Sequence, residues 1–368
     1  MSKRPVSSRS RTWLGIGVFV ATPWLLGAVH VVIKPPELLS EPAQKAFLAS
    51  KANVPFDTVA VGDSRILRIG AASFSKRGWT FFNMGMSGLS PEDTALQLLF
   101  ALDRFPVKRV VMGVSFENMT ARYPFEFSRY AEDPVFRNLR FSAFLRSQPA
   151  IRTPARAIWR DTLDELYPIG RAAVTLRYYR SRWKRWGTPN NTPDIFSPAD
   201  GTAAYAEIQK SIQAGRYDFA EHTNPADFFD RPDGDARYLE VKKLSEDAQD
   251  MYRRMFQALR ARRIPCVVFE TVKTPAYQKM IDDSALLAGL QAQWREFYRS
   301  ESRGSVRFLD ASAVRDCYHE PDFFDATHFL GATTERQLAE RLAETLATLE
   351  GAVVADVGAQ AIPGEGAQ

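Results

Sequence analysis

Five short apolar runs, separated by helical patterns, limit most strongly what this chain can fold into. The runs are 58–62 (TVAVG), 79–83 (WTFFN), 108–114 (KRVVMGV), 264–271 (IPCVVFET) and 306–309 (VRFL). Runs that are apolar on both faces suit a parallel sheet buried between two layers of helices. The alternation therefore predicts an α/β fold, a three-layer α/β/α sandwich with a five-stranded parallel flavodoxin-like sheet.

Helix signals lie between these runs. The sequence SPED at 90–93 places a serine cap, a proline and an acid where a helix begins, and this helix is expected to run to about Phe105. Amphipathic patterns predict further helices over 236–263 and 333–349. The small, Gly- and Ala-rich residues 351–368 are expected to form a disordered tail.

The core is predicted in two parts, 36–118 and 236–350, with a large and mainly helical insertion over 119–235 between them. Between Arg137 and Arg185 the insertion holds twelve basic residues and three acidic ones. Tryptophans and tyrosines are interleaved with them, namely Trp159, Tyr178, Tyr179, Trp183 and Trp186. Such mixtures suit lipid headgroups, an acidic polysaccharide or a partner protein, and a solvated helical face is the simpler alternative.

The N-terminus predicts a membrane anchor. Residues 1–12 carry four basic side chains and no acid, and the 21 residues 13–33 carry no charge. About 20 apolar residues cross a bilayer as a helix, and a basic flank stays in the cytoplasm. The expected location is the bacterial inner membrane, with the N-terminus cytoplasmic and the following domain periplasmic. A cleaved signal peptide is the alternative, but no clear A-x-A site precedes Lys34.

Composition narrows the function classes. Hydrophobic residues make up 45% and charged residues 25%, as in a folded globular protein, and the net charge of +5 is small for 368 residues. Cys266 and Cys317 form no CxxC pair, and they are expected to be buried thiols or one disulfide. No His-x-x-x-His spacing and no phosphate-binding GxxxxGK[ST] loop occurs, so no metal or other cofactor is expected.

A serine follows the first predicted strand where the chain has to turn back. Gly62-Asp63-Ser64 closes that run, and a helix is expected to begin at Ser64. The hydroxyl would then lie at the carboxyl edge of a parallel sheet, where open α/β folds bind their ligands. Backbone N–H groups at the start of such a helix can stabilise an oxyanion. The tripeptide also fits an ordinary helix cap.

A serine nucleophile needs a base, and the base needs a group that orients it. Asp325 and His328 lie three residues apart, so the carboxylate can reach the imidazole nitrogen that is remote from the serine. A surface turn is the alternative. Three other histidines have different predicted roles. His319 is a less well placed base, His222 a surface or structural residue, and His30 an interfacial residue near the end of the anchor.

A glycine-containing loop, 83–88 (NMGMSG), follows the second predicted strand and precedes the helix cap. Glycine lets the backbone approach a ligand closely and direct an N–H group toward it. An ordinary glycine turn is the alternative for this loop.

The order and placement of these three motifs resemble those of the SGNH/GDSL hydrolase superfamily. The resemblance implies that Ser64 is the nucleophile and that Gly88, in the glycine-containing loop, donates a backbone N–H to the oxyanion hole. Asp325 and His328 match the Asp-x-x-His motif of that family, which implies that His328 is the base and that Asp325 orients it.

One motif departs from the family pattern. The family usually carries an asparagine just after the third strand, as a side-chain donor to the oxyanion. Residues 113–118 read GVSFEN, so Asn118 comes about two residues late, and Ser115 is an alternative donor. The oxyanion hole can instead rest on the backbone N–H groups of Ser64 and Gly88.

The resemblance covers 36–118 and 236–350. An N-terminal anchor followed by an external domain resembles the membrane-anchored O-acetyltransferase branch, the AlgJ/AlgX-like and DltD-like proteins. This implies a serine-dependent O-acyltransferase that modifies an exported polysaccharide, with a polytopic, MBOAT-like membrane acyltransferase as its acyl donor. An esterase that deacylates a glycan or lipid, and a non-catalytic module that binds polysaccharide or a membrane complex, are the alternatives. No nucleic acid partner is expected.

Overall fold

The computed structural model describes three stretches of the chain, 55–119, 196–217 and 243–360, apart from positions 198, 204, 320, 321 and 326. It also describes five residues of the N-terminal part, which are Ala21, Glu41, Lys45, Leu48 and Ala49. Most of the predicted anchor and all of the basic stretch 137–185 therefore lie outside the described residues. Within the described ranges, no helix is both long and apolar enough to cross a membrane.

The five predicted strands form one parallel sheet. They are β1 (Thr58–Val61), β2 (Phe81–Asn83), β3 (Arg109–Val114), β4 (Cys266–Glu270) and β5 (Val306–Leu309). Their order is β2-β1-β3-β4-β5, and every neighbouring pair is parallel. The predicted α/β class and the five-stranded parallel sheet are thus confirmed. Strand order reverses between β1 and β3, and crevices at such points are where open α/β sheets bind ligands.

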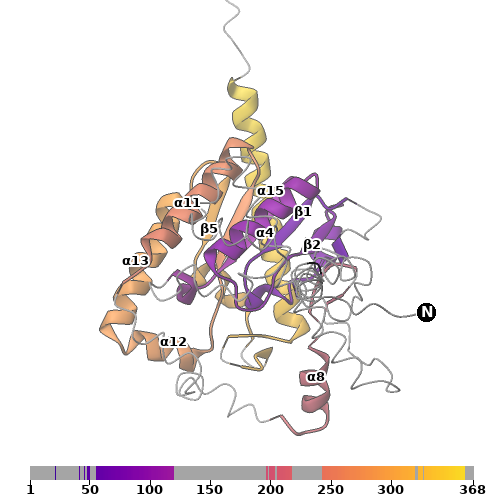
Figure 1. Ribbon diagram of the computed structural model, residues 1–368, viewed down its shortest axis with the longest axis vertical. Coiled ribbons are helices and arrows are strands. Elements are labelled where there is room, and N and C mark those ends of the chain that lie inside the picture. Colours follow the sequence, from indigo (N-terminus) through magenta and orange to yellow (C-terminus); the bar gives the residue numbers. More distant parts are fainter. Residues whose placement is uncertain are drawn as a thin grey trace, which may run out of the picture.

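One face of the sheet is covered by α4 (Pro91–Arg104), α11 (Glu246–Ala261), α12 (Pro275–Asp282) and α13 (Ala285–Glu301). Figure 1 shows α11 and α13 side by side. Successive strand residues point to opposite faces, and those packed against this helical layer include Val59, Val61, Val110, Met112, Cys266 and Val268.

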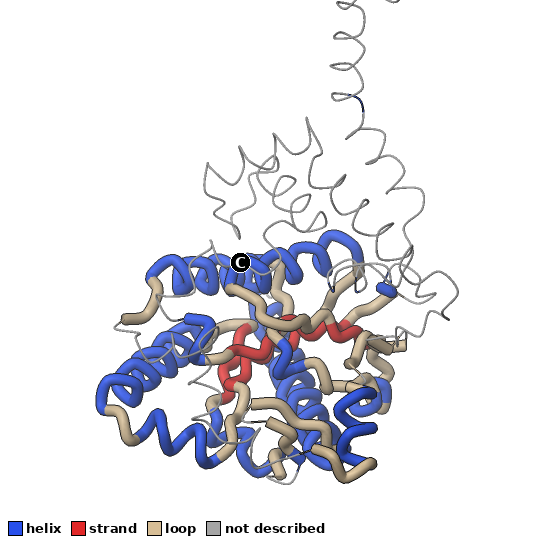
Figure 2. The backbone as a smooth tube through the Cα atoms, turned by 60° about the horizontal axis from the view of Figure 1, so that its bottom comes forward, coloured by secondary structure: helices blue, strands red, loops and turns tan. Residues whose placement is uncertain are grey.

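The other face is covered by α3 (Ala72–Ser75), α14 (Ala311–Val314) and the long α15 (Ala332–Gln360). The intervening strand residues, such as Ala60 and Val111, pack on this side. Figure 2 shows helices on both sides of the strands.

Two helix boundaries differ from the sequence prediction. Helix α11 begins at Glu246 rather than 236, because the Ser245 side chain caps it by accepting the N–H of Ala248. Helix α15 continues to Gln360, so the predicted tail beginning at residue 351 starts too early. Ala and Val dominate the turns after Gly351, and each of the two glycines, Gly351 and Gly358, costs the helix only about 1 kcal/mol. The predicted cap of α4 is confirmed, with Ser90 and Asp93 forming a capping box.

The two cysteines are buried free thiols and form no disulfide. Cys266, in β4, packs with the α11 and α13 layer, whereas Cys317 packs with the α15 layer. They lie on opposite faces of the sheet, so a bond between them would require the fold to open.

A piece of the predicted insertion, 196–217, packs beside the carboxyl edge of the sheet. The N–H of Ala203 donates to the carbonyl of Leu67 at 2.9 Å, and the N–H of Asn83 donates to the carbonyl of Asp200 at 2.7 Å. These bonds attach the piece to the turn after β1 and to the end of β2. The remaining short elements are η2 (Ser64–Ile66), η3 (Phe116–Met119), α8 (Ala206–Gln213) and η6 (Arg315–Cys317).

Candidate active site

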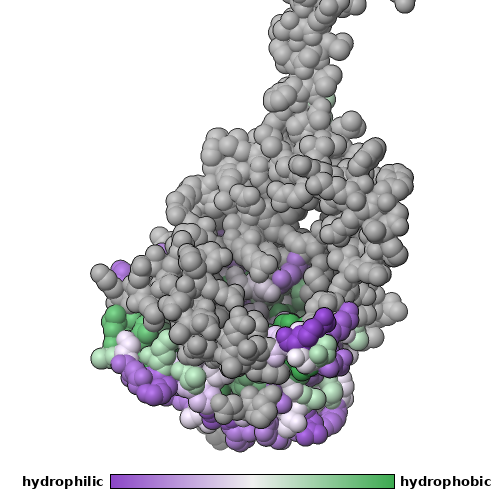
Figure 3. Space-filling model, turned by 90° about the horizontal axis from the view of Figure 1, so that it is seen from below, coloured by the Kyte–Doolittle hydropathy of each residue, from purple (hydrophilic) through white to green (hydrophobic). Residues whose placement is uncertain are grey.

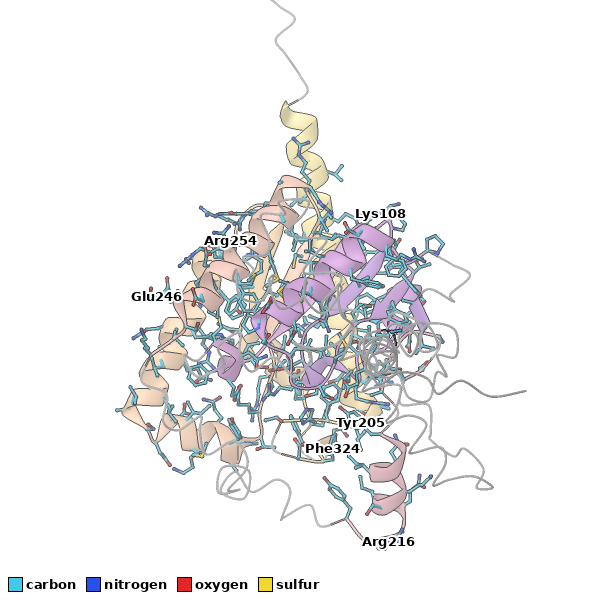
Figure 4. The ribbon with its side chains drawn as sticks, in the orientation of Figure 1. Lys108, Tyr205, Arg216, Glu246, Arg254 and Phe324 are labelled. Atoms are coloured by element: carbon cyan, nitrogen blue, oxygen red, sulfur yellow. The ribbon has the colours of Figure 1, made fainter. Side chains whose placement is uncertain are left out.

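The predicted site residues Ser64, Asp325 and His328 gather at one end of the molecule, at the carboxyl edge of the sheet. Figure 3 views this end and shows hydrophilic and apolar side chains beside one another. Tyr205 and Phe324 lie close together there, and their ring centroids are 5.1 Å apart. Lys108, which precedes β3, lies at the opposite end of the molecule (Figure 4).

A tight turn carries Ser64 away from β1. Gly62 has φ +143°, and a Cβ at this position would lie 2.7 Å from the carbonyl oxygen of Gly113. Glycine is therefore required by both conformation and space. The Asp63 side chain then accepts the N–H of Arg65, which caps η2. The helix expected at Ser64 is only this three-residue 3-10 turn, so it offers a backbone N–H group but little helix dipole.

The structure brings Ser64, His328 and Asp325 together. His328 Nε2 lies 2.7 Å from Ser64 Oγ, and His328 Nδ1 lies 2.8 Å from Asp325 Oδ2. Asp325 Oδ1 also accepts the backbone N–H groups of Thr327 and His328, at 2.7 and 2.8 Å. The three-residue spacing thus folds the carboxylate back onto its own turn and fixes it beneath the imidazole.

The protonation of this turn follows from its charges. Burial alone would raise the pKa of Asp325, but the adjacent His328 and the backbone N–H donors hold it below its usual range. An ionised carboxylate only accepts hydrogen bonds, so Nδ1 of His328 carries the proton. Nε2 is then free to accept the proton of Ser64 Oγ, which is the arrangement that a general base requires.

Aromatic side chains hold the imidazole from outside. The Phe324 ring stacks on His328 with a centroid distance of 5.7 Å. Tyr217 Oη donates to the Phe324 carbonyl at 2.5 Å, and Tyr205 Oη donates to the Ser64 carbonyl at 3.4 Å. Tyr205 has φ +48°, a left-handed conformation that is uncommon for a bulky residue and concentrates at functional sites. Burial and the nearby Asp325 raise the pKa of Tyr205, so its hydroxyl remains a donor.

Two backbone N–H groups are available to an oxyanion. Those of Ser64 and Gly88 donate to no acceptor in the described part of the chain. Asn118 Nδ2 and Ser115 Oγ, the alternative side-chain donors, both donate to Asp63 Oδ2, at 3.0 and 2.9 Å. One proton of each group is committed to that carboxylate. A role for Asn118 in the oxyanion hole stays a prediction.

Asp63 is the centre of a buried polar cluster that sequence reasoning missed. Besides Asn118 and Ser115, its carboxylate accepts the N–H and the guanidinium of Arg65, the latter at 2.6 Å. Burial alone would raise the pKa of Asp63, but the charge of Arg65 and these hydrogen bonds hold it below its usual range. The residue between Gly62 and Ser64 therefore fixes the turn that carries Ser64.

A second buried carboxylate, Glu117, lies next to this cluster. Tyr277 Oη donates to Glu117 Oε1 at 2.7 Å, and Lys273 Nζ and Arg65 Nη2 lie 3.5 and 3.7 Å from its oxygens. Burial opposes ionisation, but the charges of Lys273 and Arg65 outweigh it and lower the pKa of Glu117 to about 2. The two acids Asp63 and Glu117 and the two bases Arg65 and Lys273 thus balance one another in charge next to the turn of Ser64.

We expect Glu117 to make stability depend on acid pH. Its pKa falls from 4.5 to about 2 on folding, so its contribution is present above pH 4.5 and is lost as the pH falls toward 2. In urea unfolding between pH 3 and 5, Glu117→Gln is expected to reduce the slope of the unfolding free energy against pH by up to about 1.4 kcal/mol per pH unit. A slope equal to that of the native chain would contradict this assignment.

Of the other histidines, the structure describes His319 alone, and it does not join the site. His319 Nε2 lies 3.0 Å from Gln337 Oε1 on the exposed side of α15, and no contact joins it to Ser64. His30 and His222 lie outside the described residues. Among the residues that the structure describes, no group of three His, Cys, Asp or Glu side chains is placed to hold a metal ion.

A scan against protein-family models found no match. A search of curated proteins also found none.

Sequence patterns carry no signal for some of the residues found here. Tyr205 lies 141 positions from Ser64 in the chain, and nothing in its neighbourhood indicates that it reaches the nucleophile. Asp63 could have been found, because a carboxylate inside a tight strand-to-helix turn is placed to cap it.

Proposed function

We propose that this chain is a membrane-anchored, extracytoplasmic O-acyltransferase of SGNH type. It moves an acyl group, most simply acetyl, onto Ser64 and then onto a hydroxyl of an exported polysaccharide. The observation that carries the proposal is the unbroken chain of contacts from Ser64 Oγ to His328 Nε2, at 2.7 Å, and from His328 Nδ1 to Asp325, at 2.8 Å. Binding of a polysaccharide or a membrane complex alone does not require this Ser–His–Asp chain of contacts.

The first half-reaction loads the serine. Ser64 Oγ attacks the acyl carbonyl while its proton passes to His328 Nε2. The carbonyl oxygen takes the negative charge and is stabilised by the N–H groups of Ser64 and Gly88. The bond to the donor then breaks, and the donor leaves with the proton from His328. Asp325 stabilises the imidazolium that exists between these steps.

The second half-reaction transfers the acyl group from Ser64 to the acceptor. A sugar hydroxyl gives its proton to His328 Nε2 and attacks the acyl carbon, and Ser64 Oγ leaves and recovers the proton. Water in the same position would make the chain an esterase. The predicted anchor favours transfer, because tethering the serine at a membrane raises its effective concentration toward a membrane-bound acyl donor. We propose a polytopic, MBOAT-like acyltransferase in the inner membrane as this acyl donor.

The acyl-enzyme is the intermediate to trap. We expect the full chain, incubated with p-nitrophenyl acetate and quenched in acid, to carry one acetyl group on the peptide containing Ser64, as measured by mass spectrometry. Adding an acetyl-free oligosaccharide is then expected to move the ester onto the glycan faster than acetate is released.

Two results would count against the proposal in different ways. Acetylation of residues other than Ser64 would remove it as the nucleophile. Acetylation of Ser64 followed only by release of acetate, with membranes containing the acyl donor present, would identify an esterase instead.

A further inference from the structure

The segment between the predicted anchor and the core touches the loop that carries Gly88. Glu41 Oε2 accepts the backbone N–H of Ser87 at 2.7 Å. Four residues later, Lys45 Nζ donates to the carbonyl of Asn83 at 2.6 Å and to that of Gly201. The N-terminal segment is therefore bonded to the first residue of this loop, Asn83, and to its last residue but one, Ser87.

The loop is otherwise held by the core. The N–H groups of Met84 and Met86 donate to the carbonyls of Ala60 and Gly62, at 2.8 and 3.2 Å. The N–H of Gly85 donates to the Asn83 side chain at 2.8 Å. Ser87 differs from these neighbours, because the acceptor of its N–H is a side chain from outside the sheet and its helices.

Gly88 follows directly. Its φ of +63° lies in the region that glycine enters without steric cost, so its own conformation does not fix the direction of its N–H. That direction depends on the peptide unit between Ser87 and Gly88. A fixed Ser87 N–H restrains that unit from one side, and the Ser90 capping box restrains the chain from the other.

We propose that Glu41 is a positioning residue, which holds the Met86–Ser87 peptide unit and so fixes the chain just before Gly88, with the Gly88 N–H directed at the oxyanion formed on the acyl group. The inference rests on the proposed function, since it assumes that Gly88 serves as an oxyanion donor. It assigns to the segment after the anchor a part in the active site, in addition to its length as a tether.

Lys45 fixes the same segment four residues after Glu41. Its side chain is fully buried, and the Nζ lies 4.1 Å from the centre of the Phe196 ring. Burial lowers the pKa of Lys45 to about 7, although the negative charges of Glu41 and Asp200 act to raise it. One amine thus joins the N-terminal segment, the end of β2 and the insertion piece at a single point.

The test measures how fast Ser64 reacts with a fluorophosphonate probe in the full chain held in detergent micelles. In that reaction an Oγ–P bond forms, the P–F bond breaks, fluoride leaves and His328 takes the serine proton. The phosphoryl oxygen occupies the oxyanion position. Loss of one oxyanion donor costs about 10²–10³-fold, so the misdirected donor in Glu41→Ala is expected to lower the maximal labelling rate about 10- to 100-fold.

A positioning role predicts how the effect divides. The probe concentration that gives half-maximal labelling is expected to stay unchanged in Glu41→Ala, since the lesion acts on the charged state. Glu41→Gln is expected to recover most of the rate, because the amide oxygen still accepts the Ser87 N–H. Glu340→Ala, at an exposed ion pair with Lys76 on the outer side of α15, is the matched control and is expected to label like the native chain.

Each outcome is distinct. Equal maximal rates for Glu41→Ala and the native chain would overturn this inference and leave the proposed function standing. Equal losses in Glu41→Ala and Glu41→Gln, together with a lower unfolding midpoint, would reduce Glu41 to a structural contact and also overturn it. Absence of Ser64 labelling in the folded native chain would overturn the proposed function and this inference together.

Discussion

Replacing Ser64 by alanine is expected to lower the rate of acyl transfer by about 10⁴-fold or more, and His328→Ala is expected to cost about as much. The reason is the 2.7 Å contact between Ser64 Oγ and His328 Nε2. Without the hydroxyl no acyl-enzyme forms, and without the imidazole the hydroxyl keeps its proton. Because the two groups act as one unit, the double variant is expected to be no slower than either single variant.

Steady-state rates with p-nitrophenyl acetate, measured on chains of equal unfolding midpoint, check this result. Added imidazole is expected to restore part of the activity of His328→Ala and none of that of Ser64→Ala. Ser300→Ala, which removes a hydroxyl that donates only to the Phe297 carbonyl in α13, is the matched control. Additive losses in the double variant would show that the two side chains do not work together.

The second large effect is expected on stability. Asp63→Ala removes the acceptor of Ser115, Asn118 and the Arg65 guanidinium at once, in a site where the Asp63 side chain is only 3% exposed. Breaking a buried charged network by removing one partner costs about 3–5 kcal/mol. We expect a loss of that size in the free energy of unfolding, measured with urea at pH 7.

Asp283→Ala is the control for this measurement. Asp283 directly follows α12 and forms an exposed ion pair with Lys279 of that helix. It is expected to leave the unfolding midpoint where it is. Asp63→Asn keeps one acceptor oxygen and the volume of the side chain, so its loss is expected to be smaller. If Asp63→Ala unfolded at the same urea concentration as the native chain, the cluster would not stabilise the turn under Ser64.

Much of the fold could be predicted because local patterns carry it. All five strands lie within the apolar runs that predict them, because strands buried on both faces are mainly apolar. The edge strand β5 is the exception in burial, since Arg307 is exposed. The α4 cap could be predicted because Ser90 and Asp93 form reciprocal capping hydrogen bonds within four residues. The start of α11 could not be predicted in this way. The amphipathic pattern extends upstream of the helix, whereas the helix itself begins after the capping side chain of Ser245.

Some residues of the candidate site could likewise be predicted from local motifs, and others could not. Ser64, Asp325 and His328 belong to short motifs, and their meeting follows from the rule that parallel strands end at one edge. Glu41 and Tyr205 reach the site from distant segments of the chain. Such contacts depend on how segments pack and not on any local period, so no spacing in the sequence indicates them.

The separation of Ser64 from His328 by 264 residues has a consequence for the timing of reactivity. As a chain is made from its N-terminus, β1, β2 and β3 can pair early, whereas the turn with His328 comes after β4 and β5. Contacts so distant in the chain form late, because the intervening loop must close first. Under the proposed function, Ser64 therefore gains its general base only after the turn with His328 has packed against the end of β1.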